Sequence, residues 1–451
     1  MITLMFKNFL RSNSVKIGVL FLLFAGIVSI FVGRQFLDKQ HQSILATATY
    51  QKQHLNQNVK FHHDEMGLLL YYAKFSLINN TLPISALSIG QRDINPSIQS
   101  ITIRGLEAQK YDSDLNNPIN LLLGNIDYSF VLIFLFPLII IAFTYNIISE
   151  EKESGTWKIV FVQCQNYFLY VCSVFYVRFF VIVLILIISL LLAVFFLQIP
   201  LNTIFFTYFI TSLLYVIFWF GVCFWVVSLH KNSNYNAILL LSLWLLLIII
   251  LPAIINNYLV NKYPTPESFE TTLKQRKSYH EKWDVDKKTT INKFYGHYPQ
   301  YRKFAFPDAE FSWLWYYAMQ QMGDDESAKQ VNDLNEKLKL RNRVSADIAL
   351  FIPTLHLQIQ FNELAKSGLE NHLYFLEETS KFHEKLRLYF YPKIFNHVSV
   401  QSENWNKFKV AIFTDIHQVN PLRIFLPLVF FILLFIGMGW VNFYREVGIS
   451  G

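Results

Sequence analysis

The sequence predicts an all-α integral membrane protein: six transmembrane helices with a mainly helical extracytoplasmic domain, containing some β structure, built from two insertions. Two observations support this class. Charged residues make up only 16% of the 451 residues, and apolar residues make up 53%, whereas ordinary soluble domains carry about 25% charged residues. The apolar residues are also concentrated in long runs, which is typical of membrane spans and not of a large soluble core.

Six apolar runs are long enough to cross a bilayer, since a span needs about 20 residues to cross roughly 30 Å of hydrocarbon. Asp, Glu, Lys and Arg are missing from the interiors of these runs, although ion-coupled carriers usually keep such residues near the midplane. A carrier driven by protons or sodium is therefore not favoured. The runs place span one at 15–33, span two at 128–149, spans three to five within 176–256 (176–197, 203–228 and 236–256) and span six at 422–443.

Residues 1–14 predict a helix that lies in the cytoplasmic interface of the membrane. Its apolar residues recur at helical spacing, and Lys7 and Arg11 take the other face, as in an amphipathic interfacial helix. A small-residue cleavage site does not directly follow the first apolar run, so we expect a retained span. The apolar positions are Ile2, Met5, Phe6, Phe9 and Leu10.

Six spans place both termini on one side of the membrane. Basic residues flank the spans on that side, and the positive-inside rule then predicts that both termini are cytoplasmic, including the tail at 444–451. Arg178 lies at the edge of predicted span three, where we expect its guanidinium to reach the interface. The basic flanking residues are Lys7, Arg11, Lys16, Lys152, Lys158, Lys231 and Arg445.

Two polar insertions are predicted to face away from the cytoplasm, an extracytoplasmic segment at 34–127 and a helical domain at 257–421. Residues 35–60 contain no proline or glycine and could prolong span one as a helix. Residues 97–103 predict a short strand, because apolar and polar residues alternate in the last three of them. The second insertion is helical by pattern, with apolar residues at helical spacing in two sets: Val331, Leu334 and Leu338, then Leu369, Leu373 and Leu376.

Residues 150–165, between spans two and three, predict a cytoplasmic coupling helix. An acidic cluster precedes a Gly-Thr pair, after which the chain becomes amphipathic from Trp157 to Phe161. Glycine permits a tight turn at this position. The simpler interpretation is that the carboxylates only solvate the end of span two, and the two interpretations are compatible. The candidate residues are Glu150, Glu151, Glu153, Gly155, Thr156 and Trp157.

We find neither a phosphate-binding loop nor a metal-ligand cluster in the sequence. It contains no G-x-x-x-x-G-K-[ST] phosphate loop, so we expect ATP hydrolysis, with its ATP and Mg²⁺, only on another polypeptide. His62–Glu65 could suggest a metal, but adjacent side chains point in different directions and no partner cluster has ligand spacing. The net charge of +7 is not gathered into a basic run, which argues against nucleic-acid binding. We predict no catalytic, cofactor or metal site in this chain.

Three stretches carry a family resemblance. The run from Pro137 to Thr156, the run-in from Asn117 to Asp127, and a helical pattern after Pro353 resemble ABC transporter permeases of the second type. The resemblance is to the subgroup with a large domain of unknown function between the fifth and sixth spans. Trp157-Lys158 departs from the family pattern, in which a leucine followed by an acidic residue is common. The pattern after Pro353 consists of Gln360, Leu364, Ala365, Gly368, His372 and Phe375.

The resemblance implies a permease subunit of an ATP-driven exporter in the bacterial inner membrane. Its partners would be a separate ABC ATPase subunit, a second copy or a related permease subunit, membrane lipids and, on the outer face, a periplasmic partner. The alternative is a membrane scaffold or sensor that transports nothing and binds a partner through its extracytoplasmic domain. The charged segment at 150–158 distinguishes the two, because a scaffold needs no ATPase-binding surface.

Overall fold

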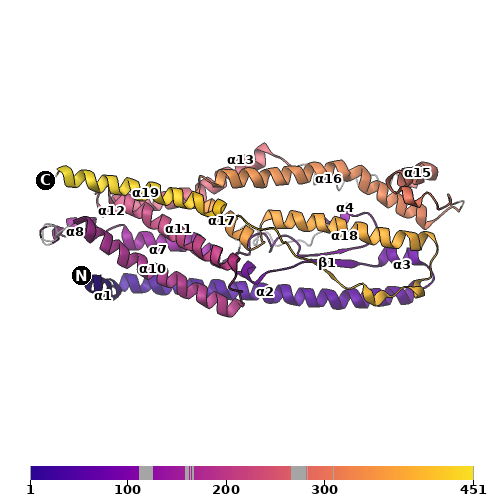
Figure 1. The fold of residues 1–451 in the computed structure, drawn as a ribbon, viewed down its shortest axis with the longest axis horizontal. Coiled ribbons are helices and arrows are strands. Elements are labelled where there is room, and N and C mark those ends of the chain that lie inside the picture. Colours follow the sequence, from indigo (N-terminus) through magenta and orange to yellow (C-terminus); the bar gives the residue numbers. More distant parts are fainter. Residues whose placement is uncertain are drawn as a thin grey trace.

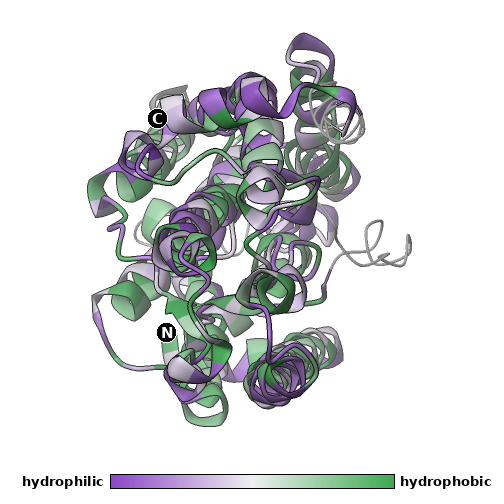
Figure 2. Ribbon diagram, turned by 90° about the vertical axis from the view of Figure 1, so that its right-hand side faces the viewer, coloured by the Kyte–Doolittle hydropathy of each residue, from purple (hydrophilic) through white to green (hydrophobic). Residues whose placement is uncertain are grey.

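The molecule is elongated, and its long helices run along its long axis (Figure 1). Viewed from one end, these helices are seen nearly down their axes (Figure 2). Helices contain 76% of the residues that the structure describes. Both termini lie at the same end, called here the proximal end (Figure 1). The computed structural model describes residues 2–110, 125–157, 162, 164, 167–265, 281, 283–307 and 309–449.

Six helical stretches in the described part of the chain are long and apolar enough to cross a membrane. This confirms the prediction of an all-helical, multi-pass membrane class. A short amphipathic helix, α1 (Ile2–Arg11), precedes them. The candidate spans are Asn13–Phe61 (α2), Tyr128–Glu153 (α6, η2, α7 and α8), Tyr167–Leu197 (α10), Thr203–Val227 (α11), Ser233–Lys262 (α12, η3 and α13) and Pro421–Tyr444, which lies within α19 (Pro421–Ile449).

Several helices extend beyond the apolar runs that predicted them. Helix α2 has 49 residues and is therefore about 70 Å long at 1.5 Å per residue, so it continues well past one bilayer thickness. Helix α10 begins at Tyr167, not at residue 176, and α19 continues to Ile449, through most of the predicted tail. The extension of α2 confirms the prediction made from residues 35–60, whereas the extensions of α10 and α19 were not predicted.

Spans two and five are interrupted by π turns. In span two, η2 (Val131–Leu135) lies between α6 (Tyr128–Phe130) and α7 (Phe136–Thr144). In span five, η3 (Leu246–Ile250) lies between α12 (Ser233–Leu245) and α13 (Leu251–Lys262). A proline follows each π turn, Pro137 in span two and Pro252 in span five. Proline lacks an N–H and its ring crowds the preceding turn, and a π turn is a common way to absorb that irregularity.

The two polar insertions pack together into a distal domain, defined here as the described parts of residues 35–110 and 281–420. It contains one three-stranded sheet in the order β2-β1-β3, with β1 antiparallel to β2 and parallel to β3. Strand β2 lies within the predicted strand at 97–103, whereas β1 and β3 were not predicted. The strands are β1 (Phe75–Asn79), β2 (Ile98–Ile101) and β3 (Ala411–Phe413).

Helices dominate the distal domain, as predicted for the second insertion. The leucine patterns at 331–338 and 369–376 lie on the two longest of these helices, α16 and α18. The helices are α3 (Met66–Tyr72), α4 (Glu107–Lys110), α15 (Lys287–His297), α16 (Trp313–Ala349), α17 (Pro353–Leu364) and α18 (Leu369–Phe395), with short 3₁₀ turns at Pro83–Ala86, Pro299–Tyr301, Val400–Ser402 and Trp405–Lys407.

A buried arginine joins the two insertions. The Arg387 side chain on α18 is 2% exposed and forms an ion pair with Asp324 on α16 at 2.8 Å. Its guanidinium also donates to the carbonyls of Ile103 (3.1 Å) and Arg104 (2.8 Å), which belong to the first insertion. A buried charge is tolerated only when it is paired and hydrogen-bonded. Arg387 therefore fixes the segment after β2 against α16 and α18.

The aromatic-rich start of α16 forms the core of the distal domain. Trp315, Tyr316 and Tyr317 are buried in one apolar cluster with residues of α3, α15 and α18. Gly67 on α3 allows this packing, because a Cβ at that position would lie 2.2 Å from the Trp313 ring. These aromatic residues are therefore core residues.

Candidate functional site

The predicted coupling segment lies at the proximal end, where span two is interrupted. Helix α7 ends at Thr144, residues 145–148 form a turn, and a short helix, α8 (Ser149–Glu153), follows. A second turn at 154–156 interrupts the single helix that was expected over 150–165. Most of the predicted amphipathic stretch, Lys158–Phe161, lies outside the described residues, as do residues 163, 165 and 166. Helix α8 is seen at the proximal end of the bundle in Figure 1.

Gly155 explains why α8 is short. Its φ is +77°, in the left-handed region, which residues other than glycine rarely adopt. A Cβ added at Gly155 would meet no atom within 4 Å. The requirement for glycine therefore comes from the backbone conformation and not from lack of space. The expected tight turn is present.

The three carboxylates of the segment have different partners. The side-chain amide of Asn146 donates to Glu150 at 2.6 Å. The hydroxyl of Thr156 donates to the Glu151 carboxylate and to the Glu151 carbonyl, the latter at 3.3 Å. Glu151 and Thr156 thus close the turn around Gly155. Glu150 and Thr156 remain exposed and Glu151 is half-buried.

Glu153 connects α8 to the start of span five. Its carboxylate accepts hydrogen bonds from the backbone N–H (2.8 Å) and the hydroxyl (2.9 Å) of Ser233, the first residue of α12. The Ser233 hydroxyl is also 2.8 Å from the Ser149 hydroxyl on α8. The first N–H groups of a helix have no partner within the helix, and a negative charge is stabilising there. Glu153 thus has a structural partner in span five.

Trp157 faces the start of span three. Its ring packs edge-on against Tyr167 at 4.8 Å between centroids, and the Lys152 ammonium lies 5.3 Å from the indole. The Lys152 Nζ is also 3.5 Å from Nδ1 of His230, in the loop between α11 and α12. Burial, and then the charge of Lys152, lower the pKa of His230 to about 4. The imidazole is therefore neutral at pH 7 and Nδ1 can accept from the lysine.

Two other spans satisfy the carbonyls that are freed where span two breaks. The Arg178 guanidinium on α10 donates to the Phe143 carbonyl, and the Asn236 amide on α12 donates to the Tyr145 carbonyl at 3.1 Å. A bilayer offers no water to unpaired backbone groups, so such partners are needed there. We refer to residues 145–148 with these two hydrogen bonds as the inner break.

Arg178 has a partner that the sequence did not predict. Because α10 begins at Tyr167, Arg178 lies well inside the helix and not at its edge. Its guanidinium is directed at the Phe143 carbonyl and lies 5.5 Å from the Phe9 ring of α1. Arg178 therefore joins spans two and three and α1.

Side chains also donate hydrogen bonds to backbone carbonyls at the two π turns. In span two, the Tyr215 hydroxyl on α11 donates to the Ile133 carbonyl at 3.0 Å, and the Trp244 indole on α12 donates to the Phe134 carbonyl at 3.1 Å. In span five, the donor comes from the distal domain: the hydroxyl of Thr354 on α17 donates to the Leu247 carbonyl at 2.5 Å.

Helix α17 makes two further contacts with the spans. Nε2 of His356 is 3.0 Å from the Ile424 carbonyl on α19. The Phe361 ring stacks on Tyr208 of α11 with centroids 4.1 Å apart. Burial, and then repulsion by Glu370, raise the pKa of Glu363, near the end of α17, to about 7. Helix α17 therefore contacts spans four, five and six.

The structure does not gather the His62–Glu65 run into a metal site. His62 stacks on Tyr72 with centroids 5.1 Å apart, and His63 pairs with its exposed neighbour Asp64. Within the described ranges, His, Cys, Asp and Glu side chains form no group of three that could hold a metal ion.

Sequence reasoning identified the charged segment but missed the residues that hold it. Asn146, Arg178 and Asn236 are polar residues in or beside apolar runs, and Ser233 lies in the polar stretch 230–234 before span five. Polar side chains in such positions are costly in a membrane and usually have a partner. Each could therefore have been noted as a residue in need of an acceptor, although the sequence does not say which one.

The comparisons with known proteins cover part of the chain. Residues 269–410 match a family model described as Domain of unknown function (DUF3526). This stretch lies between the fifth and sixth candidate spans and contains α15 to α18, including α17. The search of curated proteins and the search of solved structures each found no match to the chain.

Proposed function

We propose that the chain is the permease subunit of an ATP-driven exporter of the second ABC type, and that α8 binds a separate ATPase subunit that carries the ATP and Mg²⁺. The observation that carries the proposal is the way α8 is held. An exposed, charged helix at the proximal end is hydrogen-bonded to span five through Glu153, and the chain just before it is hydrogen-bonded to spans three and five.

These contacts give α8 a mechanical role. A force applied to α8 reaches α12 through the Glu153–Ser233 hydrogen bonds. It also reaches α10 and α12 through the carbonyls of the inner break. A loop that only solvates the end of a span needs none of these connections. Binding and release of an ATPase at α8 would therefore displace spans two, three and five together.

The proposed orientation places the proximal end in the cytoplasm and the distal domain outside the bacterial inner membrane. Both termini and α8 lie at the proximal end (Figure 1). Basic residues of α1, of the start of α2 and of the loop before α12 belong to the same end, and an excess of lysine and arginine marks cytoplasmic flanks. These residues include Lys7, Arg11, Lys16 and Lys231.

A second copy or a related permease subunit would cover the exposed spans. The most apolar window of span five is only 17% buried within the chain and that of span six 22%, compared with 67% for span four. Exposed side chains such as Ile238 on α12 and Leu433 on α19, 67% exposed in each case, leave an apolar face for a partner or for lipid. We propose that the two halves move against each other to export the substrate.

The partner of α8 can be identified by site-specific crosslinking. A photoreactive phenylalanine analogue would replace Ser154, which is exposed in the turn after α8, or Ser402, which is exposed in the distal domain. In membranes of the native host, we expect the probe at 154, and not the probe at 402, to capture a protein with a phosphate loop. Capture of partners only at 402 would favour the scaffold alternative.

A further inference from the structure

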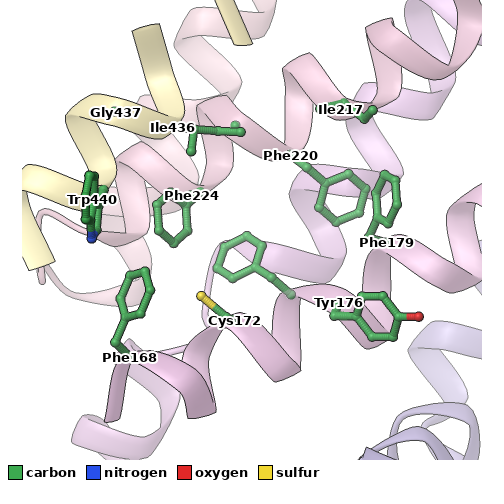
Figure 3. Close-up of a pocket in the computed structure, with 12 residues that line it drawn as sticks. Phe168, Cys172, Tyr176, Phe179, Ile217, Phe220, Phe224, Ile436, Gly437 and Trp440 are labelled. Carbon is green, nitrogen blue, oxygen red and sulfur yellow. The ribbon is translucent and has the colours of Figure 1, made fainter. Parts of the chain in front are cut away.

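An apolar groove lies among spans three, four and six, in the half of the bundle nearest α8. Phenylalanines from α10 and α11 form most of its wall, and a short stretch of α19 completes it (Figure 3). The groove has a volume of about 700 Å³ and is lined by no charged side chain. Its lining residues are Phe168, Cys172, Phe175, Tyr176, Phe179, Ile217, Phe220, Gly221, Phe224, Ile436, Gly437 and Trp440.

Gly437 of α19 borders open space in the groove. A Cβ added at Gly437 would meet no atom within 4 Å, so the space beside it is unfilled. At Gly439, two residues further along α19, a Cβ would lie 2.5 Å from the Phe224 ring. Helices α11 and α19 are therefore in close contact on one side of α19, while the groove opens on another side, between this pair and α10.

The dimensions of the groove suit an acyl chain. It follows α10 from Phe168 to Phe179, which is about 16 Å at 1.5 Å per residue, or close to half of the roughly 30 Å hydrocarbon thickness. It thus matches one leaflet. A transmembrane helix about 10 Å wide and 30 Å long occupies roughly 2,400 Å³, several times the volume of the groove. A void of this size within hydrocarbon would not stay empty, because its lining would lose its packing partners.

The end of the groove nearest α8 leads to basic residues. Phe168 contacts Phe443 at 5.9 Å, Phe443 contacts His230 at 5.2 Å, and His230 is 3.5 Å from the Lys152 ammonium. Lys231 is adjacent to His230 in the chain, and both lysines are exposed. The nearby Glu153 and Glu151 carboxylates already accept hydrogen bonds from Ser233 and Thr156.

We propose that the groove binds one acyl chain of an anionic phospholipid, whose phosphate lies near Lys152 and Lys231. Trp440 and Tyr176, 58% and 56% exposed, lie along the groove and provide the amphipathic rings that favour the membrane interface. Basic residues next to a membrane attract anionic headgroups. This lipid site does not depend on the proposed transport function.

Photolabelling of the full-length protein in phosphatidylcholine nanodiscs tests the proposal. The probes would be phosphatidylglycerol and phosphatidylcholine, each with a photoreactive group near the middle of one acyl chain. We expect the phosphatidylglycerol probe to label peptides containing 168–179 and 436–440. Gly437→Leu fills the open space and should abolish this labelling. Leu433→Phe, at an exposed position outside the groove, is the matched control and should leave it unchanged.

A second pair of variants tests the headgroup. Lys152→Gln and Lys231→Gln should each lower phosphatidylglycerol labelling roughly five-fold and leave phosphatidylcholine labelling unchanged. Size-exclusion chromatography and circular dichroism would verify folding, and the smaller Gly437→Ala should give an intermediate loss if Gly437→Leu does not fold. Equal labelling of Gly437→Leu and the parent, or equal labelling by both lipids, would overturn the proposal. So would a loss of dimer in Gly437→Leu with labelling intact, since the groove would then bind a second copy.

Discussion

The inner break and the π turn of span five both interrupt a transmembrane helix, but different parts of the molecule complete them. At the inner break, the donors Arg178 and Asn236 come from neighbouring spans. At the π turn of span five, the donor is Thr354 of the distal domain. The inner break also leads directly into an exposed charged helix, whereas the π turn lies beneath α17. The bundle is thus hydrogen-bonded to α8 at one end and to the distal domain at the other.

This difference indicates how movement could pass through the bundle. Hydrogen bonds from charged donors are about twice as strong as those between neutral groups, so the Arg178 contact should be the stiffer of the two. The hydrogen bond from Thr354 to the Leu247 carbonyl joins two neutral groups and should break and re-form more easily. We infer that spans two and three move as one unit at the inner break and that span five can shift relative to α17.

The largest effect is expected at Arg178. Arg178→Leu leaves the Phe143 carbonyl without its donor in an apolar setting, and we expect a loss of about 3 kcal/mol in the free energy of unfolding. Denaturation of the purified protein in mixed micelles would measure it. Arg178→Lys keeps a charged donor and should recover part of the loss. Unchanged stability in Arg178→Leu would mean that the carbonyl has another partner and that the inner break is not held by span three.

The next effect is the contribution of Glu363, in the distal domain, to the pH dependence of stability. Burial and the neighbouring Glu370 raise the pKa of Glu363 from 4.5 to about 7, while Lys366 opposes the shift and Asp415 adds to it. A raised carboxyl pKa contributes stability that is complete below pH 4.5 and is lost as the pH rises through 7. Relative to Glu363→Gln, the parent should lose about 2 kcal/mol between pH 5 and pH 8.

Thermal unfolding at both pH values would measure this difference. Glu150→Gln is the matched control at the proximal end, because Glu150 is exposed, and it should keep the pH dependence of the parent. If Glu363→Gln also keeps that dependence, another group is responsible and the contrast between the two ends is lost.

A smaller effect is expected at Thr354. Thr354→Val removes the hydroxyl that serves the Leu247 carbonyl but keeps the shape of the side chain, and we expect a loss of about 1.5 kcal/mol. Thr354→Ser retains the hydroxyl and should be close to the parent. If Thr354→Val destabilises as much as Arg178→Leu, the two contacts are equally stiff and the comparison fails.

The smallest effect is expected at Glu153. Glu153→Gln keeps an acceptor for Ser233 but removes the charge at the start of α12, and about 0.5 kcal/mol should be lost at low ionic strength. Salt screens such an exposed interaction, so the same denaturation experiment in about 1 M salt should give no difference. A loss that persists in salt would indicate a shape requirement at Ser233 and not an electrostatic one.

The fold class and the six spans could be predicted because a helix that crosses the hydrocarbon of a bilayer must be about 20 residues long and mainly apolar. The two long distal helices also followed from leucines at helical spacing. Strand β1 could not be predicted in this way, because Phe75–Asn79 is buried throughout and shows no alternation. Strand β3 pairs with a segment more than 300 residues away, and sequence spacing carries no information on such a pairing.

The candidate site was predictable only in part. The charges of 150–153 and the glycine of the turn are local signals, so their exposure and the positive φ followed from the sequence. The partners Arg178, Ser233 and Asn236 are fixed by how the spans pack, which depends on shape complementarity along whole helices. The apolar run also did not show that the helix around Arg178 begins earlier, at Tyr167.

ATP turnover in the reconstituted complex tests the central claim most directly. Ser154→Trp adds bulk to the exposed turn after α8 without touching the Glu153–Ser233 contact, and Ser402→Trp adds the same bulk to the distal domain. If α8 binds the ATPase, Ser154→Trp should reduce hydrolysis by the complex to that of the isolated ATPase, with the melting temperature of the permease unchanged, and Ser402→Trp should behave as the parent. Full ATP turnover in Ser154→Trp would show that α8 is not the coupling surface.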